Sequence, residues 1–211
     1  MSGSSIEALD LAALLCSRVC HDLISPVGAI VNGLEVLAEE KDEETQAFAM
    51  ELIKKSANTA SAKLQFCRIA FGAAGSAGSQ IDTGDAEKLS RGFLEDDKTK
   101  IALNLPRVLL GKNRVKLLLN MLLIAGQTIP RGGQITVDPI GEGDTMGLRV
   151  SATGANVKVL PTVPPLLSGE TPADGLDAHR IQPFYASLLA GACGLTPSIV
   201  LEGDTVVVAA Q

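Results

Sequence analysis

Two segments near the N-terminus carry apolar residues at alternating steps of four and three, and this pattern limits the possible folds more than any other feature. Over residues 6–40 these positions are Cys16, Cys20, Leu23, Val27, Ile30, Leu34 and Leu37. Over residues 44–72 they are Ile53, Ala57, Ala60, Leu64, Cys67 and Phe71. Such a seam is typical of helices in a left-handed bundle. The charged run over residues 39–44 separates the two segments, so the sequence predicts an antiparallel helical hairpin.

A hairpin of two helices cannot cover its own apolar seams. Ala57 and Ala60 are small enough to let a neighbouring helix approach closely. Pairing two hairpins into a four-helix bundle would bury the seams, so we expect a homodimer. The alternative is that the hairpin packs on the C-terminal part of its own chain.

Residues 73–80 are rich in Gly, Ser and Ala, which is typical of a flexible linker. This linker divides the chain into a helical part, residues 1–72, and a second domain, residues 81–211. In the second domain the pattern predicts a loop over residues 157–180 and helices over about 113–129 and 182–193. It predicts strands near 100–105, 134–139, 147–152, 198–202 and 205–209. Helices mixed with antiparallel hairpins indicate an α+β fold.

The composition argues against several classes of function. A net charge of −6 offers no basic face for nucleic acid. No run of about 18 apolar residues is present, so we expect no membrane span, and the N-terminus lacks the basic start of a secretory signal. The four cysteines form no CxxC motif, so we expect reduced, buried thiols in a cytoplasmic protein. These cysteines are Cys16, Cys20, Cys67 and Cys193.

Residues 21–26 read His-Asp-Leu-Ile-Ser-Pro and carry the richest chemistry in the chain. Pro26 has no N–H to bond the carbonyl of Asp22, and its ring crowds that carbonyl, so the helix should bend one turn after His21. His21 lies one step from the seam position of Cys20, so its imidazole should face solvent and a ring nitrogen can act as a nucleophile. Asp22 could accept a hydrogen bond from the other ring nitrogen and fix the tautomer.

Neighbouring residues extend this candidate site. Arg18 and Ser25 lie one turn before and after the histidine and share its general face. They could contact a group carried on the imidazole or a partner, or be ordinary solvated side chains. Ile24 and Gly28 border the same surface and would suit the docking of a partner helix. Val27 also borders it, but its place in the seam predicts a core position.

Two further features suggest chemistry that the sequence does not support. Cys16, Cys20 and His21 could form a metal site, but thiols one helical turn apart in a seam are typical of a core. No fourth ligand is evident, so we predict no metal. His179 lies in the predicted loop without a recognisable partner, and we expect it to be solvated.

The stretch over residues 21–26 resembles the phospho-acceptor box of sensor histidine kinases, His-Asp/Glu-Leu-x-x-Pro. Residues 118–137 resemble the first nucleotide-box segment of the kinase ATPase domain, with Asn120 at its first asparagine. This resemblance covers nearly the whole chain. It implies a dimeric helical hairpin followed by an α/β sandwich like the ATPase domain of those kinases.

Three residues depart from the kinase pattern. Ile124 stands where the family has an asparagine that helps to bind magnesium, Ala152 where it has the aspartate that reads adenine, and Asn156 where it has a glycine. Isoleucine cannot ligate magnesium, which demands oxygen ligands, and a methyl group cannot accept a hydrogen bond from adenine. After Asn156, no Gly-x-Gly phosphate loop precedes the helix predicted over residues 182–193. These departures imply an ATPase fold that does not bind nucleotide.

A kinase-like chain that keeps the histidine and lacks an ATP site resembles the dimeric histidine phosphotransferases of bacterial cell-cycle phosphorelays. The resemblance implies that His21 accepts a phosphoryl group from the receiver domain of a hybrid histidine kinase (CckA-like), with Asp22 as its acidic neighbour. It then passes the group to response-regulator receivers (CtrA-like and CpdR-like). The resemblance also implies no cofactor, with magnesium only on the partner receiver. Two other hypotheses stay open: a non-catalytic dimeric adaptor that binds receivers, and a histidine kinase with an aberrant ATP site.

Overall fold

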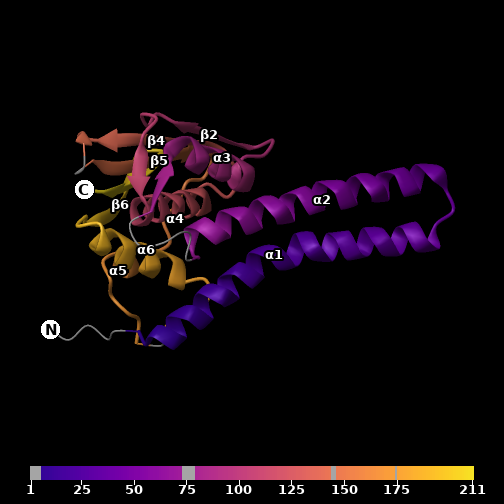
Figure 1. The fold of residues 1–211 in the computed structure, drawn as a ribbon, viewed down its shortest axis with the longest axis horizontal. Helices are drawn as coiled ribbons and strands as arrows, with labels where there is room; N and C mark the ends of the chain where they lie inside the picture. The colour runs from indigo at the N-terminus through magenta and orange to yellow at the C-terminus, as the bar shows by residue number, and fades with distance from the viewer. Residues whose placement is uncertain (1–5, 73–78, 144–145, 174) are drawn as a thin grey trace.

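The computed structural model describes residues 6–72, 79–143, 146–173 and 175–211. A long helical hairpin projects from a two-layer α/β domain (Figure 1). The predicted architecture, a helical hairpin followed by an α/β sandwich, is confirmed. Most of the predicted linker, residues 73–80, lies outside the described residues.

The hairpin consists of α1 (Ala8–Glu39) and α2 (Glu43–Ala70), which run antiparallel (Figure 1). Asp42 lies in the short turn and caps α2, because its carboxylate accepts the backbone N–H of Thr45 at 2.8 Å. The acidic stretch of the sequence thus ends one helix and begins the next, as its pattern predicted.

The face of α1 that packs inward differs from the apolar seam predicted for it. The buried residues of α1 are Arg18, Pro26 and Gly33. Gly33 lets the two helices approach closely, because a Cβ there would lie 2.7 Å from Cγ1 of Ile53 on α2. Val27 and Leu34 of the seam are exposed, so the prediction that Val27 is a core residue is wrong within a single chain.

A five-stranded mixed sheet forms one layer of the second domain, in the order β2-β4-β5-β7-β6. Its strands are β2 (Thr99–Leu103), β4 (Gly133–Ile140), β5 (Gly147–Gly154), β6 (Pro197–Glu202) and β7 (Thr205–Ala210). β2 pairs with β4 in parallel, and the other neighbours pair antiparallel. These strands match the predicted ones. A separate antiparallel pair, not predicted, joins β1 (Gln80–Asp82) to β3 (Leu109–Gly111).

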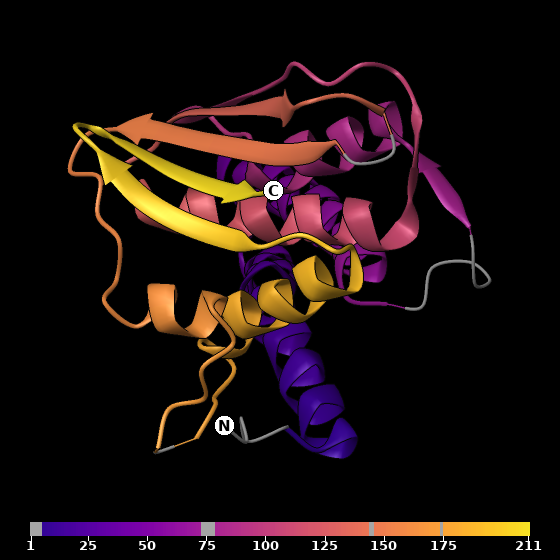
Figure 2. The same cartoon turned by 90° about the vertical axis from the view of Figure 1, so that its left-hand side faces the viewer.

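Helices form the other layer, beneath the sheet in Figure 2. They are α3 (Thr83–Leu94), α4 (Lys112–Thr128), α5 (Val163–Leu167) and α6 (Ile181–Ala192). Twelve of the 17 residues of α4 are buried, which makes this helix the centre of the core. α4 and α6 were predicted. α5 interrupts the predicted loop over residues 157–180, because Pro164 and Pro165 lie in its first turn, where proline needs no backbone donor.

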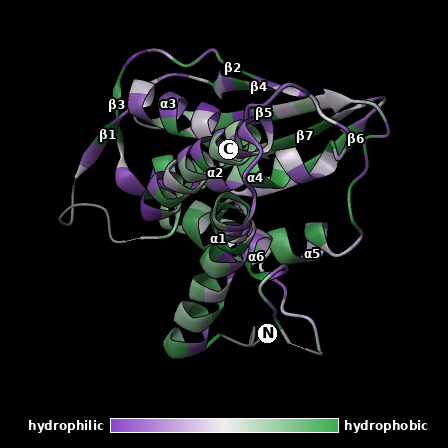
Figure 3. Cartoon of the chain, turned by 90° about the vertical axis from the view of Figure 1, so that its right-hand side faces the viewer, coloured by the Kyte–Doolittle hydropathy of each residue, from purple (hydrophilic) through white to green (hydrophobic). Residues whose placement is uncertain are grey.

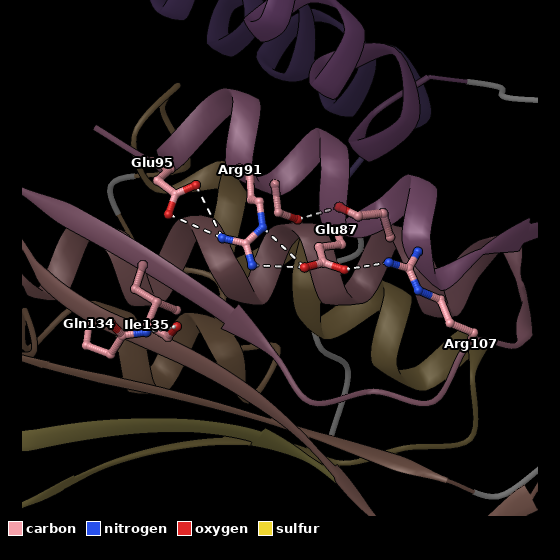
Figure 4. Close-up of polar contacts among 8 residues, drawn as sticks. Glu87, Arg91, Glu95, Arg107, Gln134 and Ile135 are labelled. Atoms are coloured by element: carbon pink, nitrogen blue, oxygen red, sulfur yellow. Dashed lines mark hydrogen bonds and ion pairs between the residues drawn. The ribbon is translucent and has the colours of Figure 1, made fainter. Parts of the chain in front are cut away.

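Ion pairs along α3, which the sequence pattern did not predict, hold the edge of the helical layer (Figure 4). Arg91 donates to Glu87 and Glu95, each one helical turn away. Arg107, in the loop before β3, donates to the second oxygen of Glu87 at 3.1 Å. Exposed pairs such as these stabilise a fold only modestly, but they connect this loop to α3.

The base of the hairpin shares the core of the second domain. Phe66, Ile69 and Ala70, at the end of α2, are buried in the same cluster as the side chains of α4. Asn120 of α4 is fully buried and donates hydrogen bonds to the carbonyls of Ala70, at 3.2 Å, and Lys116, at 2.8 Å. The base of the hairpin is therefore anchored on the C-terminal domain of the same chain. The alternative hypothesis, that the hairpin packs on its own C-terminal part, holds for this base.

Beyond the base, the hairpin carries exposed apolar side chains on both helices, and Figure 3 shows hydrophobic residues along α1. These side chains, which we call the apolar arm, are Ile24, Val27, Val31, Leu34, Phe48, Met50, Leu52 and Leu64. Cys16 and Cys20 are also exposed, so the expectation that all four thiols are buried is wrong within one chain. Cys67 is buried as expected, and Cys193 is half-buried.

By length and composition alone, α1 could also cross a membrane. The sequence prediction counted uninterrupted apolar residues, and a few charged residues interrupt the run in α1. These charged residues lower the mean hydropathy of the helix only slightly, so the count missed this property. In the structure α1 is one arm of the hairpin, with Arg18 and Asp22 paired within it.

Candidate functional site

His21 presents an exposed imidazole on α1. Its side chain is 57% exposed, whereas the neighbouring carboxylate of Asp22 is only 10% exposed. Nδ1 of His21 lies 3.7 Å from Oδ1 of Asp22. This separation is longer than a hydrogen bond, but it makes Nδ1 the nitrogen that faces the carboxylate. Nε2, across the ring, is therefore the nitrogen available to a partner.

Arg18 fixes the other oxygen of this carboxylate. Its Nε donates to Oδ2 of Asp22 at 3.1 Å, and both side chains are nearly buried. The expectation that Arg18 shares the exposed face of the histidine is therefore wrong. Arg18 lies three residues before His21 and four before Asp22, and its ion pair with Asp22 directs it toward the buried side of the helix. The pair holds Asp22 in place with Oδ1 directed toward the imidazole.

Pro26 removes a backbone hydrogen bond from α1, and a side chain of α2 replaces it. Proline cannot donate to the carbonyl of Asp22, four residues earlier. Nζ of Lys63 donates to this carbonyl instead, at 3.1 Å. The same ammonium lies 5.7 Å from the ring centroid of Phe93 on α3. Pro26 lies inside a helix that is visibly bent in Figure 1, and Lys63 ties its freed carbonyl to α2.

The other predicted site residues lie at the surface around the histidine. Ile24 is 72% exposed, and Ser25 is exposed beside it. A Cβ built on Gly28 would have no neighbour within 4 Å, so this glycine leaves open space above the helix backbone. The structure thus brings Ile24, Ser25 and Gly28 to one accessible strip next to His21, while Arg18 and Pro26 lie beneath it.

His179 is a residue of this site that sequence reasoning missed. Its ring centroid lies 5.0 Å from that of His21, and the two ring planes meet at 79°, an edge-to-face contact. The expectation that His179 is a solvated loop residue without a partner is therefore wrong. No local pattern could have revealed the contact, because only the packing of α1 against α6 brings these distant segments together.

The positions that correspond to nucleotide ligands in histidine kinases lie in the core of this chain. Asn120, Ile124 and Ala152 are all buried, and the amide of Asn120 donates to backbone carbonyls. Across the same layer, Nε2 of Gln127 donates to Oε1 of Gln182 at 3.0 Å. The side chains of Ile124 and Ala152 offer neither an oxygen for magnesium nor an acceptor for adenine, so these two positions do not fit a magnesium–nucleotide complex.

Metal binding finds no further support in the described part of the chain. No group of three or more His, Cys, Asp or Glu side chains there is arranged to hold a metal ion. The thiols of Cys16 and Cys20 are exposed on α1 without the additional ligands that a tetrahedral site needs.

Comparison with known proteins decides the family. A family model described as the histidine phosphotransferase C-terminal domain matches residues 83–205. Protein phosphotransferase ChpT of Brucella abortus (strain 2308) is 50% identical over 207 residues, which cover 98% of each chain. The chain belongs to the histidine phosphotransferase family. The resemblance drawn from the sequence is thereby confirmed.

A solved structure agrees with this family in fold, and a second one is more distantly similar. A bacterial phosphotransferase that is 46% identical has a TM-score of 0.90, with both chains covered completely. Full-length ShkA in complex with AMPPNP is 16% identical, with a TM-score of 0.46 over 93% of this chain and 44% of that one. The family model begins at α3 and does not include His21, whereas the similarity to ChpT extends over both domains of this histidine phosphotransferase. Family membership supports a histidine phosphotransfer function.

Proposed function

We propose that this chain relays phosphoryl groups between receiver domains through a phosphohistidine on Nε2 of His21. The observation that carries the proposal is the exposed imidazole whose Nδ1 faces the nearly buried Asp22, so that Nε2 is left free. Donor and acceptor are both aspartates of receiver domains, so the transfer is reversible.

The chemistry needs no proton transfer away from the imidazole. The lone pair of Nε2 attacks phosphorus, the bond from phosphorus to the carboxylate oxygen of the donor breaks, and its electron pair stays on that carboxylate. Nδ1 keeps its hydrogen, so the ring of the phosphohistidine becomes cationic beside Asp22. A second receiver aspartate then attacks the same phosphorus and returns His21 to its starting state. The transition state is loose, so positioning and electrostatics supply the catalysis.

No cofactor of its own is part of this proposal, and magnesium is contributed by the receiver. The buried positions of Ile124 and Ala152 leave no ligands for magnesium or adenine, which argues against ATP-dependent autophosphorylation. Incubation with labelled ATP alone should therefore leave the chain unlabelled. Self-labelling on His21 would favour the hypothesis of a kinase with an aberrant ATP site.

A homodimer joined through the hairpins is the proposed assembly. The apolar arm exposes large side chains on both helices, and on α1 Val27, Val31 and Leu34 recur at helical spacing, as is typical of a protein interface. Two hairpins packed as a four-helix bundle would cover these side chains and leave Ile24, beside His21, accessible. A strictly monomeric chain at micromolar concentration in light scattering would contradict this part of the proposal.

The partners are proposed from family resemblance. They are the receiver of a hybrid histidine kinase of the CckA type and response-regulator receivers of the CtrA and CpdR types, in a cytoplasmic cell-cycle phosphorelay. The accessible strip of Ile24, Ser25 and Gly28 would accept a receiver helix beside the histidine. The net charge of −6 gives no basis for a nucleic-acid partner, and we propose no membrane partner.

The deciding experiment is a phosphotransfer assay with purified components. A phosphorylated receiver is mixed with the chain and a second receiver, across a panel of receivers. The variant His21→Ala should abolish relay, while the exposed control Arg131→Ala should relay as the wild type does. Relay that survives in His21→Ala would refute the mechanism. Binding of receivers without any phosphorylation of the wild-type chain would favour the non-catalytic adaptor.

A further inference from the structure

We propose that His179 is a second imidazole of the phosphotransfer site, which holds the ring of His21 and donates a hydrogen bond to the phosphoryl group on Nε2. The proposal rests on phosphotransfer through His21, as proposed above. It adds a residue from the C-terminal domain to a site that the sequence located on α1 alone.

The contact between the rings has the geometry expected of an attractive aromatic pair. The centroids lie 5.0 Å apart and the planes meet at 79°, which is an edge-to-face arrangement. Both residues are exposed, so close packing of a core does not force the rings together. We place the phosphoryl group of Nε2 on the side of His179, where the 5.0 Å separation of the two rings would let an imidazole N–H reach its oxygens.

Packing on both sides of His179 holds it next to His21. Leu176 and Ile181 flank the segment and belong to one apolar cluster with Leu14 of α1. His21 follows Leu14 by about two helical turns and so projects from the same face of α1. The face of α1 that packs on the segment before α6 therefore also carries His21.

A turn before α6 fixes the backbone of this segment. Oδ1 of Asp177 accepts the backbone N–H groups of His179 and Arg180, both at 2.8 Å. Asp and Asn commonly close turns in this way. These hydrogen bonds lower the pKa of the Asp177 carboxyl, the bond from Arg180 most, so the turn persists at neutral pH. The side chain of His179 is left to project from a defined backbone.

The local charges leave a role for a hydrogen-bond donor at His179. The charged side chains around the two rings are Arg18, Asp22, Lys63, Asp177 and Arg180. The carboxylates among them each have an arginine partner: Asp22 has Arg18, and Asp177 has Arg180. Phosphorylation of Nε2 adds negative charge, and an imidazole N–H of His179 would donate a hydrogen bond to that charge.

The test compares two substitutions that separate the ring from its N–H groups. His179→Phe keeps an aromatic ring but has no donor, whereas His179→Asn keeps a donor and loses the ring. Labelling of His21 by a phosphorylated receiver is followed over time. We expect His179→Phe to label about tenfold more slowly, the loss typical of one charge-assisted hydrogen bond.

The Asn variant should recover part of the rate. Melting temperature and receiver affinity are measured for each variant, and both should match the wild type. Equal rates in wild type and His179→Phe would overturn the proposal, as would an equal loss in both variants. A wild-type chain that never becomes labelled, or relay by His21→Ala, would instead refute the proposed function itself.

Discussion

The surroundings of His21 and those of Asn120 both carry motifs typical of histidine kinases, yet they have opposite environments. The imidazole of His21 is more than half exposed and borders charged groups, whereas Asn120, Ile124 and Ala152 are buried in the core. The chemistry that we propose lies where the motif residue is accessible and its neighbours orient it. In the buried region, the matching residues have become packing and backbone anchors.

The largest effect is expected from returning a carboxylate to the buried region. Ala152→Asp places a carboxylate at a fully buried position of β5 without a cationic partner, so we expect a loss of several kcal/mol in the free energy of unfolding or failure to fold. Thr153→Asp, on the exposed face of the same strand, is the matched control and should cost less than about 1 kcal/mol. Urea unfolding measures both. If ATP stabilised the Ala152→Asp variant, the region around Asn120 would still bind nucleotide, and the contrast with the region around His21 would be wrong.

A smaller loss is expected at the anchor between hairpin and domain. Asn120→Ala leaves the buried carbonyl of Ala70 without its side-chain donor, which should cost about 1–3 kcal/mol of stability. Asn104→Ala removes an exposed amide that bonds Asp138 and should have a smaller effect. Chemical unfolding of both variants checks the prediction. Equal costs would mean that burial does not distinguish the two amides.

At the exposed region, the bond from Lys63 to the carbonyl of Asp22 can be isolated by a double-mutant cycle. Lys63→Met should cost about 1 kcal/mol and slow phosphotransfer, because the carbonyl loses its donor. Pro26→Ala restores a backbone N–H for the same carbonyl, so Lys63→Met should cost less in that background. Lys55→Met, an exposed lysine on α2, is the control. Additive effects of the two substitutions would show that Lys63 does not compensate for the proline.

The smallest effect on stability at neutral pH is expected from the cysteine thiols. Burial raises the pKa of the Cys67 thiol to about 11 from 9.0, with a lesser contribution from the charge of Asp22. Its contribution to stability is therefore complete below about pH 9 and is lost as the pH rises toward 11. Near pH 8 a thiol reagent should modify the exposed Cys16 and Cys20 quickly and Cys67 slowly. Rapid modification of Cys67 would mean that the base of the hairpin opens readily.

Sequence periodicity was sufficient for the elements that pack by a regular apolar pattern. The hairpin, α4, α6 and the strands of the main sheet were predicted in this way. α3 was missed because its residues are mostly polar and its exposed face is occupied by the ion pairs of Arg91. α5 was missed because it is short and begins with prolines, which usually indicate a loop.

The candidate site was predictable only as far as local sequence could define it. The motif located His21 and Asp22, because both lie in one short stretch of helix. It could not decide which side of α1 packs on α2, so Arg18 was placed on the wrong face. Lys63 and His179 reach the site from other parts of the chain, and their contributions depend on tertiary packing that no local pattern encodes.

The filled interior around Asn120 has a consequence for how this chain can evolve. Each single substitution toward a nucleotide ligand, at position 124 or 152, would place an unpaired polar group in a close-packed core. Stability would fall at every such step, whereas binding would appear only after several substitutions together with a rebuilt loop. If the chain works as proposed, selection acting on one mutation at a time would therefore keep it dependent on phosphoryl groups supplied by another protein.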